Sequence, residues 1–215
     1  MVDSPSAADP GRWDQRYREG GDGWELGRPA PPLAAFLQED DRAPRPPGRV
    51  LVPGCGRGHE AALLEACGFS VVGLDFSGEA LRQARRFHGD DRPTLRWLQA
   101  DLFDPGPLAR GGLETAGLDG VVEHTCFCAV DPGLRQAYAA TVARLLRPGG
   151  WFLGLFWCHG REGGPPWGAD PTAVAALFAA AGLAARVWEP ARGSVEKRQG
   201  EEWLGLWARP AAASA

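Results

Sequence analysis

Short apolar runs alternate with amphipathic stretches along most of the chain. Runs such as residues 49–53 are typical of buried strands, and the apolar spacing within residues 59–67 indicates a helix with one packing face. Ser77 precedes a polar-faced stretch and is a good N-cap residue. We expect strands over residues 49–53, 70–74, 95–99, 120–127, 151–157, 184–189 and 201–208. We expect helices over residues 11–19, 33–38, 59–67, 77–88, 132–146 and 171–181.

This alternation of strands and helices predicts right-handed crossovers and therefore a parallel sheet. The last two strands are the exception, because the polar loop 190–200 between them hardly has room for a helix. They are expected to form an antiparallel hairpin at the sheet edge. The predicted fold is an α/β, doubly wound, mostly parallel sheet of seven strands with helices on both faces and this C-terminal hairpin.

The length of 215 residues fits a single α/β domain with a short extension. A Pro-rich linker over residues 42–48 leads into the first strand. We therefore divide the chain into an N-terminal extension (1–48), a main domain (49–209) and a short tail (210–215). Residues 1–10 are expected to be disordered.

Composition excludes several classes of partner. The net charge of −4 offers no broad basic field for nucleic acid, and no apolar run approaches the roughly 20 residues of a membrane span. The polar N-terminus does not resemble a secretory signal. Five cysteines without framework spacing predict reduced thiols and a cytoplasmic protein. The expected partner is a small molecule, and the expected state is a monomer or a simple homo-oligomer.

The strongest local signal is a glycine-rich turn after the first strand, Val50-Leu51-Val52-Pro53-Gly54-Cys55-Gly56-Arg57-Gly58. Glycines let the backbone approach a ligand, and the following helix N-terminus offers free N–H groups. Asp75 ends the second strand, about 20 residues after Gly54, where a carboxylate can accept hydrogen bonds from nucleoside ribose hydroxyls. Asp101 ends the third strand, close to where the base would lie. These residues predict a nucleoside-binding crevice at the carboxyl ends of the strands.

Two other ligand classes fit the same residues less well. The dinucleotide fingerprint requires a sixth-position glycine, where this chain has His59, and no basic residue follows as in a phosphate-binding P-loop. Cys158, His159 and Glu162 lie near one another, but no second cluster supplies zinc-like spacing. No metal is expected.

The glycine turn, Asp75, Asp101 and the terminal hairpin together resemble class I S-adenosylmethionine (SAM)-dependent methyltransferases over residues 49–209. Three further segments resemble the thiopurine and halide/thiol methyltransferase family: Trp13-Asp14-Gln15-Arg16-Tyr17, Gly23-Trp24-Glu25-Leu26-Gly27-Arg28-Pro29 and Glu123-His124-Thr125-Cys126-Phe127-Cys128-Ala129.

The resemblance implies SAM as the cofactor and an N-terminal extension that folds over it as a lid. A sulfonium beside tryptophan would also gain cation–π attraction. By matched position and strand-end placement, the expected cofactor-binding residues are Trp13, Tyr17, Trp24, Gly54, Gly56, Asp75, Phe76, Asp101, Leu102 and His124. His124 is also the candidate catalytic base, because an imidazole titrates near neutral pH.

The expected reaction is methyl transfer from SAM to a small soft nucleophile such as a thiol, hydrosulfide or halide. Three alternatives remain open at this point: a methyltransferase acting on oxygen or nitrogen of another small molecule, a nicotinamide-dinucleotide oxidoreductase, and a SAM-binding module without activity. Retained ligand in the purified protein would separate the dinucleotide class from the others.

Overall fold

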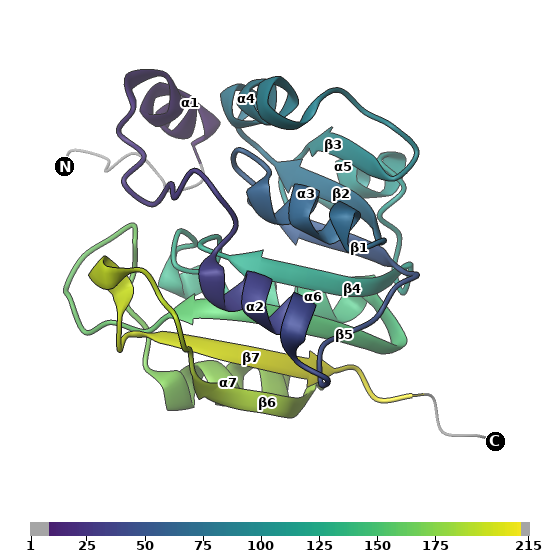
Figure 1. Ribbon diagram of the computed structural model, residues 1–215, viewed down its shortest axis with the longest axis vertical. Coiled ribbons are helices and arrows are strands. Elements are labelled where there is room, and N and C mark those ends of the chain that lie inside the picture. Colours follow the sequence, from purple (N-terminus) through teal and green to yellow (C-terminus); the bar gives the residue numbers. More distant parts are fainter. Residues whose placement is uncertain (1–8, 212–215) are drawn as a thin grey trace.

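Seven strands form one sheet in the computed structural model of the chain, which describes residues 9–211 (Figure 1). The strand order is β3-β2-β1-β4-β5-β7-β6. The strands are β1 (Arg49–Pro53), β2 (Ser70–Asp75), β3 (Leu95–Gln99), β4 (Leu118–His124), β5 (Leu146–Trp157), β6 (Ala184–Pro190) and β7 (Glu202–Ala208). β7 pairs antiparallel with both β5 and β6, and the other neighbours are parallel. The predicted fold class and the edge hairpin are confirmed.

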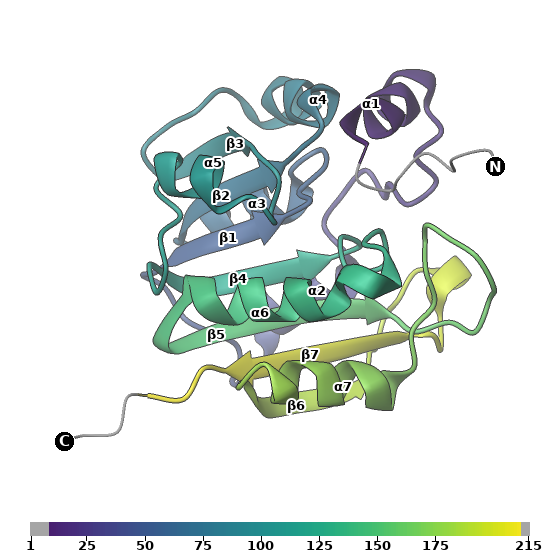
Figure 2. The ribbon, with the colours of Figure 1, turned by 180° about the vertical axis from the view of Figure 1, so that it is seen from behind.

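Helices cover both faces of the sheet (Figures 1 and 2). One face packs against α2, α3 and α4, and the other against α5, α6 and α7. The helices are α1 (Pro10–Glu19), α2 (Pro31–Glu39), α3 (His59–Ala66), α4 (Gly78–His88), α5 (Pro105–Arg110), α6 (Arg135–Leu145) and α7 (Pro171–Ala180). Two 3₁₀ turns, η1 (Pro132–Leu134) and η2 (Glu196–Arg198), lie in connections.

The structure corrects several predicted boundaries. The strand expected over 120–127 ends at His124, because Thr125 adopts a left-handed conformation with φ 61° and turns the chain. The helix expected over 132–146 begins as a 3₁₀ turn and becomes α-helical only at Arg135. β5 begins at Leu146 rather than at residue 151, and α5 was not predicted.

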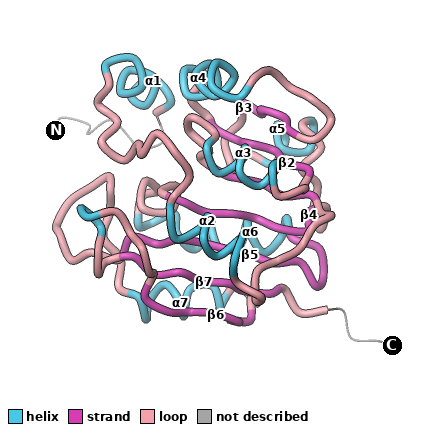
Figure 3. Tube along the Cα trace, viewed as in Figure 1, coloured by secondary structure: helices cyan, strands magenta, loops and turns pink. Residues whose placement is uncertain are grey.

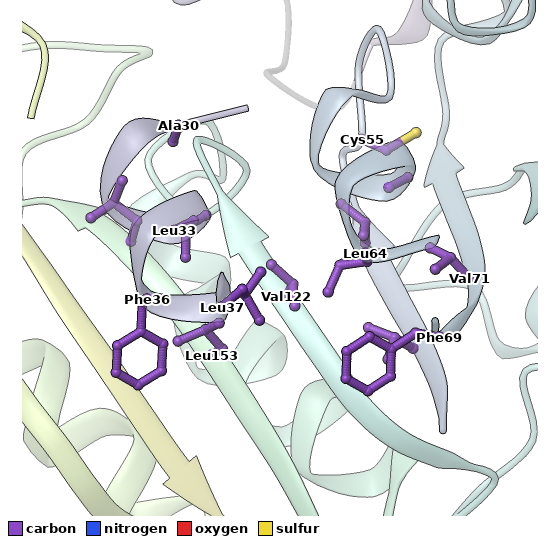
Figure 4. Close-up of a cluster of buried hydrophobic side chains, with 14 of the residues drawn as sticks. Ala30, Leu33, Phe36, Leu37, Cys55, Leu64, Phe69, Val71, Val122 and Leu153 are labelled. Carbon is purple, nitrogen blue, oxygen red and sulfur yellow. The ribbon is translucent and has the colours of Figure 1, made fainter. Parts of the chain in front are cut away.

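α2 belongs to the core of the main domain although it precedes the linker. Its apolar face carries Leu33 and Leu37, which lie beside Val122 of β4 and Leu153 of β5 (Figure 4). Both leucines are buried. Of the described residues that precede α2, residues 9–29, here called the N-terminal segment, lie outside the helix layers that cover the sheet.

The N-terminal segment lies at the carboxyl ends of the parallel strands, with α1 beside α4 (Figures 1 and 3). Of the disorder expected over residues 1–10, residues 1–8 lie outside the described part of the chain, whereas Asp9 caps α1 and Pro10 begins it. The segment is thus placed over the edge where the sequence predicts the ligand crevice.

Candidate active site

The glycine turn after β1 has the geometry that its sequence predicts. Gly54 and Gly56 adopt left-handed φ values of 55° and 52°. A Cβ on Gly54 would lie 2.8 Å from Cys126 Sγ, and one on Gly56 would lie 2.7 Å from Tyr17 Oη. Both positions therefore require glycine, for conformation and for space.

Asp75, at the end of β2, is held rigidly beside this turn. Its Oδ2 accepts a hydrogen bond from Gly56 N at 2.9 Å, and its Oδ1 accepts one from Ser77 N at 2.9 Å. Burial raises the pKa of Asp75 to about 6, although these backbone donors oppose the shift. A carboxylate offers about four acceptor sites, so Asp75 keeps capacity for two ligand hydroxyls.

A cavity of about 380 Å³ opens between this edge of the sheet and the N-terminal segment. It brings together most of the predicted site residues: Trp13, Tyr17, Trp24, Gly54, Asp75, Phe76, Asp101 and Leu102. Two predicted residues, Gly56 and His124, do not line the cavity. Gly56 contributes indirectly, because its N–H donates to the Asp75 carboxylate. Asp101 is exposed at the rim, where its Oδ1 accepts a hydrogen bond from Phe103 N at 2.9 Å.

Three aromatic rings of the N-terminal segment form one wall of the cavity. The Trp24 ring meets those of Trp13 and Tyr17 edge-on, at centroid distances of 5.4 and 5.7 Å. Arg16 also lines the cavity, with its guanidinium 5.7 Å from the Trp13 ring and 5.5 Å from the Trp24 ring. This wall presents aromatic faces, which attract cations, and the guanidinium of Arg16 already lies against two of them.

Polar contacts dock the N-terminal segment onto the main domain. The Asp14 carboxylate accepts hydrogen bonds from Ser77 Oγ and, at 3.0 Å, from Glu79 N at the start of α4. On its other side, Arg57 forms ion pairs with Asp22 at 2.5 Å and with Glu25 at 3.1 Å. The segment is therefore closed over the cavity in this structure.

The end of the cavity away from Asp75 is mostly apolar. Sequence reasoning singled out the segment that holds Cys126, Cys128 and Ala129 but missed the rest of this wall: Val130, Leu134, Trp157, Pro165 and Pro166. Thr125 and Asp131 are the polar residues of the lining beside it. Burial raises the pKa of the Cys128 thiol to about 12 and that of Cys126 well above its usual value. Both thiols are consequently neutral at physiological pH.

His124, the candidate base, lies at the end of β4 with both ring nitrogens in contact with protein groups. Its Nδ1 is 2.8 Å from Glu60 Oε1, and its Nε2 is 2.9 Å from Arg198 Nη1. Arg198 is fully buried, although it comes from the polar loop between β6 and β7. No sequence signal marked Arg198 as a residue near the site.

The profile of the thiopurine S-methyltransferase family matches residues 8–204 of the chain. The chain belongs to this family.

Individual members show the same relationship. The chain is 32% identical over 200 residues to thiocyanate methyltransferase 1 of Arabidopsis thaliana, covering 92% of this chain and 84% of that protein. It is 31% identical over 200 residues, with the same coverage, to the probable thiol methyltransferase 2 of that plant. It is 30% identical over 181 residues to a thiopurine S-methyltransferase of Vibrio cholerae, covering 79% and 81% of the two chains.

The fold of this family member is that of solved SAM-dependent methyltransferases. A 1,6-didemethyltoxoflavin-N1-methyltransferase of Burkholderia thailandensis, with bound S-adenosylhomocysteine, superposes with a TM-score of 0.71 at 22% identity, over 97% of this chain and 93% of that one. The expected cofactor class, SAM, is confirmed. Because that neighbour is named for methylation at nitrogen, the shared fold does not determine the acceptor.

The described residues, 9–211, offer neither a metal site nor a membrane-spanning helix. No group of three or more His, Cys, Asp or Glu side chains in that range is placed to hold a metal ion. No helix there is both long and apolar enough to cross a membrane.

Proposed function

We propose that this family member transfers the methyl group of SAM to the sulfur of a small thiol, or to a related soft anion such as hydrosulfide or a halide. The single observation that carries the proposal is the division of one cavity. One end presents the buried carboxylate of Asp75, and the other presents an apolar wall with neutral thiols.

The residues at the Asp75 end fit the nucleoside part of SAM. Asp75 would accept hydrogen bonds from the ribose hydroxyls, and Phe76, Asp101 and Leu102 would surround the adenine. Gly54 lines the cavity, and its lack of a side chain lets the turn pack closely against Cys126. The rings of Trp13, Tyr17 and Trp24 would face the sulfonium, where cation–π attraction contributes about 0.5–2 kcal/mol.

When bound, SAM supplies a methyl group already activated by its positive sulfur, so the protein has little bond-making chemistry to perform. Its residues have to align the acceptor with the methyl group and exclude water. The closed N-terminal segment and the apolar wall suit both tasks. Water exclusion also removes the hydration shell of a soft anion, which favours displacement at carbon.

The lining supports sulfur rather than oxygen or nitrogen as the acceptor atom. The described residues that line the cavity include no histidine or lysine, and the carboxylates among them are those of Asp75, Asp101 and Asp131. We assign Asp75 to the ribose, and a carboxylate is too weak a base to ionise an alcohol to any extent. A thiol with a pKa near 8.5 is already several per cent thiolate at neutral pH, and a halide needs no base. An alcohol would remain protonated. Cys126 and Cys128 do not compete as acceptors, because burial keeps them neutral.

We also propose that the protein works in a reducing compartment such as the cytoplasm. All five cysteines are unpaired, which suits that environment.

A panel of acceptors with methyl-labelled SAM tests the proposed reaction. Small thiols and hydrosulfide are expected to take up label, and matched alcohols and amines are not. Label on a phenol or an amine, with none on thiols at the same concentration, would assign this family member to another acceptor class. An absence of label from every acceptor, together with retained SAM binding, would support a module without activity.

A further inference from the structure

Three buried side chains form a continuous polar chain behind the cavity: Glu60 of α3, His124 of β4 and Arg198 of η2. Their side chains are 12%, 8% and 0% exposed. Glu60 Oε1 lies 2.8 Å from His124 Nδ1, and His124 Nε2 lies 2.9 Å from Arg198 Nη1. The chain joins three elements that are far apart in the sequence.

The donors and acceptors in this chain can be assigned. A guanidinium only donates hydrogen bonds, so Nε2 of His124 must accept from Arg198. The ring proton is therefore on Nδ1 and is donated to Glu60. Burial opposes the charge of Glu60, but His124 and the amide of Ala30 outweigh it and hold the pKa of Glu60 below its usual value. Neither nitrogen of His124 is left to take a proton from an acceptor.

The two ends of this Glu60–His124–Arg198 network contact the cavity wall, the N-terminal segment and the start of α2. Arg198 Nη2 donates to the carbonyl of Trp24 at 2.9 Å, and the guanidinium lies 4.9 Å from the centroid of the Trp157 ring. Trp24 and Trp157 both line the cavity. At the other end, Glu60 Oε1 accepts a hydrogen bond from Ala30 N at 3.0 Å. Trp24 and Ala30 bracket the stretch that connects the N-terminal segment to α2.

The arrangement also explains how a buried arginine is tolerated. Arg198 faces Glu202, whose carboxylate is 3.4 Å from Nη1 and 3% exposed. A buried arginine requires a partner charge and satisfied donors. His124 and Trp24 each accept a hydrogen bond from the guanidinium, whereas the buried Nε of Arg198 has no partner among the described residues. Removing His124 therefore takes away one of the few acceptors that Arg198 has.

We propose that Glu60, His124 and Arg198 are positioning residues that hold Trp24 and Trp157 against the bound cofactor and acceptor. His124 acts through Arg198 and is not the base of the reaction. This proposal rests on the proposed function only where turnover is measured. SAM affinity and the protease resistance of the N-terminal segment test it independently of turnover.

The test compares His124→Leu with His124→Gln in the full chain. Leucine removes both hydrogen bonds, whereas glutamine can donate and accept. His124→Leu is expected to weaken SAM binding by about tenfold in calorimetry, because it loosens the hydrogen bond from the Arg198 guanidinium that holds Trp24 at the cavity. It should also expose residues 20–28 to limited proteolysis. His124→Gln should recover most of both losses.

A control variant on α3, the helix that carries Glu60, separates positioning from general stability. Glu65 pairs with Arg92 and does not line the cavity. Glu65→Leu should lower the melting temperature without changing SAM affinity or the cleavage of residues 20–28. If His124→Leu fails to fold, Arg198→Lys takes its place, because lysine keeps the charge but cannot reach Trp24, His124 and Glu202 together.

Turnover with thiols of different acidity distinguishes positioning from base catalysis. A positioning role predicts the same relative loss in His124→Leu for an aromatic thiol that is ionised at neutral pH and for an alkyl thiol that is not. Three results together would overturn the proposal. SAM affinity is unchanged in His124→Leu, its loss in kcat grows with the pKa of the acceptor thiol, and His124→Gln does not restore kcat. If the wild-type protein methylates no thiol, the proposed function fails, and calorimetry and proteolysis still decide the positioning role.

Discussion

The protonation of Asp75 should control cofactor affinity between pH 5 and pH 7.5. Burial raises the pKa of this carboxyl to about 6 in the free protein. Ribose hydroxyls need the ionised form as acceptor, so bound SAM draws that pKa down and binding releases a proton. Affinity is therefore greatest well above pH 6 and falls as the pH drops through 6. At pH 5 about one molecule in ten is ionised, which predicts roughly tenfold weaker binding than at pH 7.

Calorimetry with S-adenosylhomocysteine in two buffers of different ionisation enthalpy measures both the affinity and the proton released. Asp75→Asn is the matched control. Its amide nitrogen would face either Gly56 N or Ser77 N, both of which now donate to the carboxylate, so the turn itself is disturbed. Losing a charge-assisted hydrogen bond costs about 1.5–3 kcal/mol, or roughly ten- to hundredfold in affinity.

The variant should therefore bind weakly at every pH and lose the component of pH dependence centred near 6. A wild-type affinity that is flat from pH 7.5 to pH 5, or a pH dependence that Asp75→Asn keeps unchanged, would show that Asp75 does not hold the cofactor.

Three further predictions concern the N-terminal segment, the glycine turn and Glu123. Removal of residues 1–25 leaves α2 in place, so the protein should keep a folded circular dichroism spectrum, reduced only by the signal of α1, but lose activity and most SAM affinity; full activity would show that the aromatic wall is dispensable. Gly54→Ala places a Cβ 2.8 Å from Cys126 Sγ at a φ of 55° and should lower both the melting temperature and SAM affinity, whereas Gly160→Ala meets nothing within 4 Å and should change neither; equal effects of the two would refute the steric argument. Burial raises the pKa of Glu123 to about 7, so the stability that its neutral form supplies is present below about pH 4.5 and is lost as the pH rises through 7. Chemical denaturation of the wild type and of Glu123→Gln at pH 5 and pH 8 should show that loss only in the wild type, and a parallel decline in both would contradict it.

The sheet and the cofactor end of the cavity could be predicted because their signals are local. A buried strand, a glycine turn and a carboxylate at the next strand end occur in sequence order, and the alternation of elements fixes the crossovers. The prediction for Asp75 needed only its place at the end of β2. α5 was missed because it has only six residues, two of them proline and one glycine, and its pattern is that of a turn.

Most of the apolar wall could not be predicted because it is assembled from irregular loops. Val130, Leu134, Pro165 and Pro166 come from two connections that have no hydrophobic period, and only the fold brings them together. Arg198 stands in a polar loop where a charged residue is normally solvated. Its burial depends on Glu202 and on His124, which is 74 positions away in the sequence.

The central claim is that sulfur accepts the methyl group, and an acceptor that carries both a thiol and a hydroxyl tests it within one molecule. The protein is incubated with methyl-labelled SAM and 2-mercaptoethanol, and the position of the label is read by mass spectrometry and NMR. The account predicts the S-methyl thioether with an unmodified hydroxyl group. An O-methyl ether as the main product would contradict it.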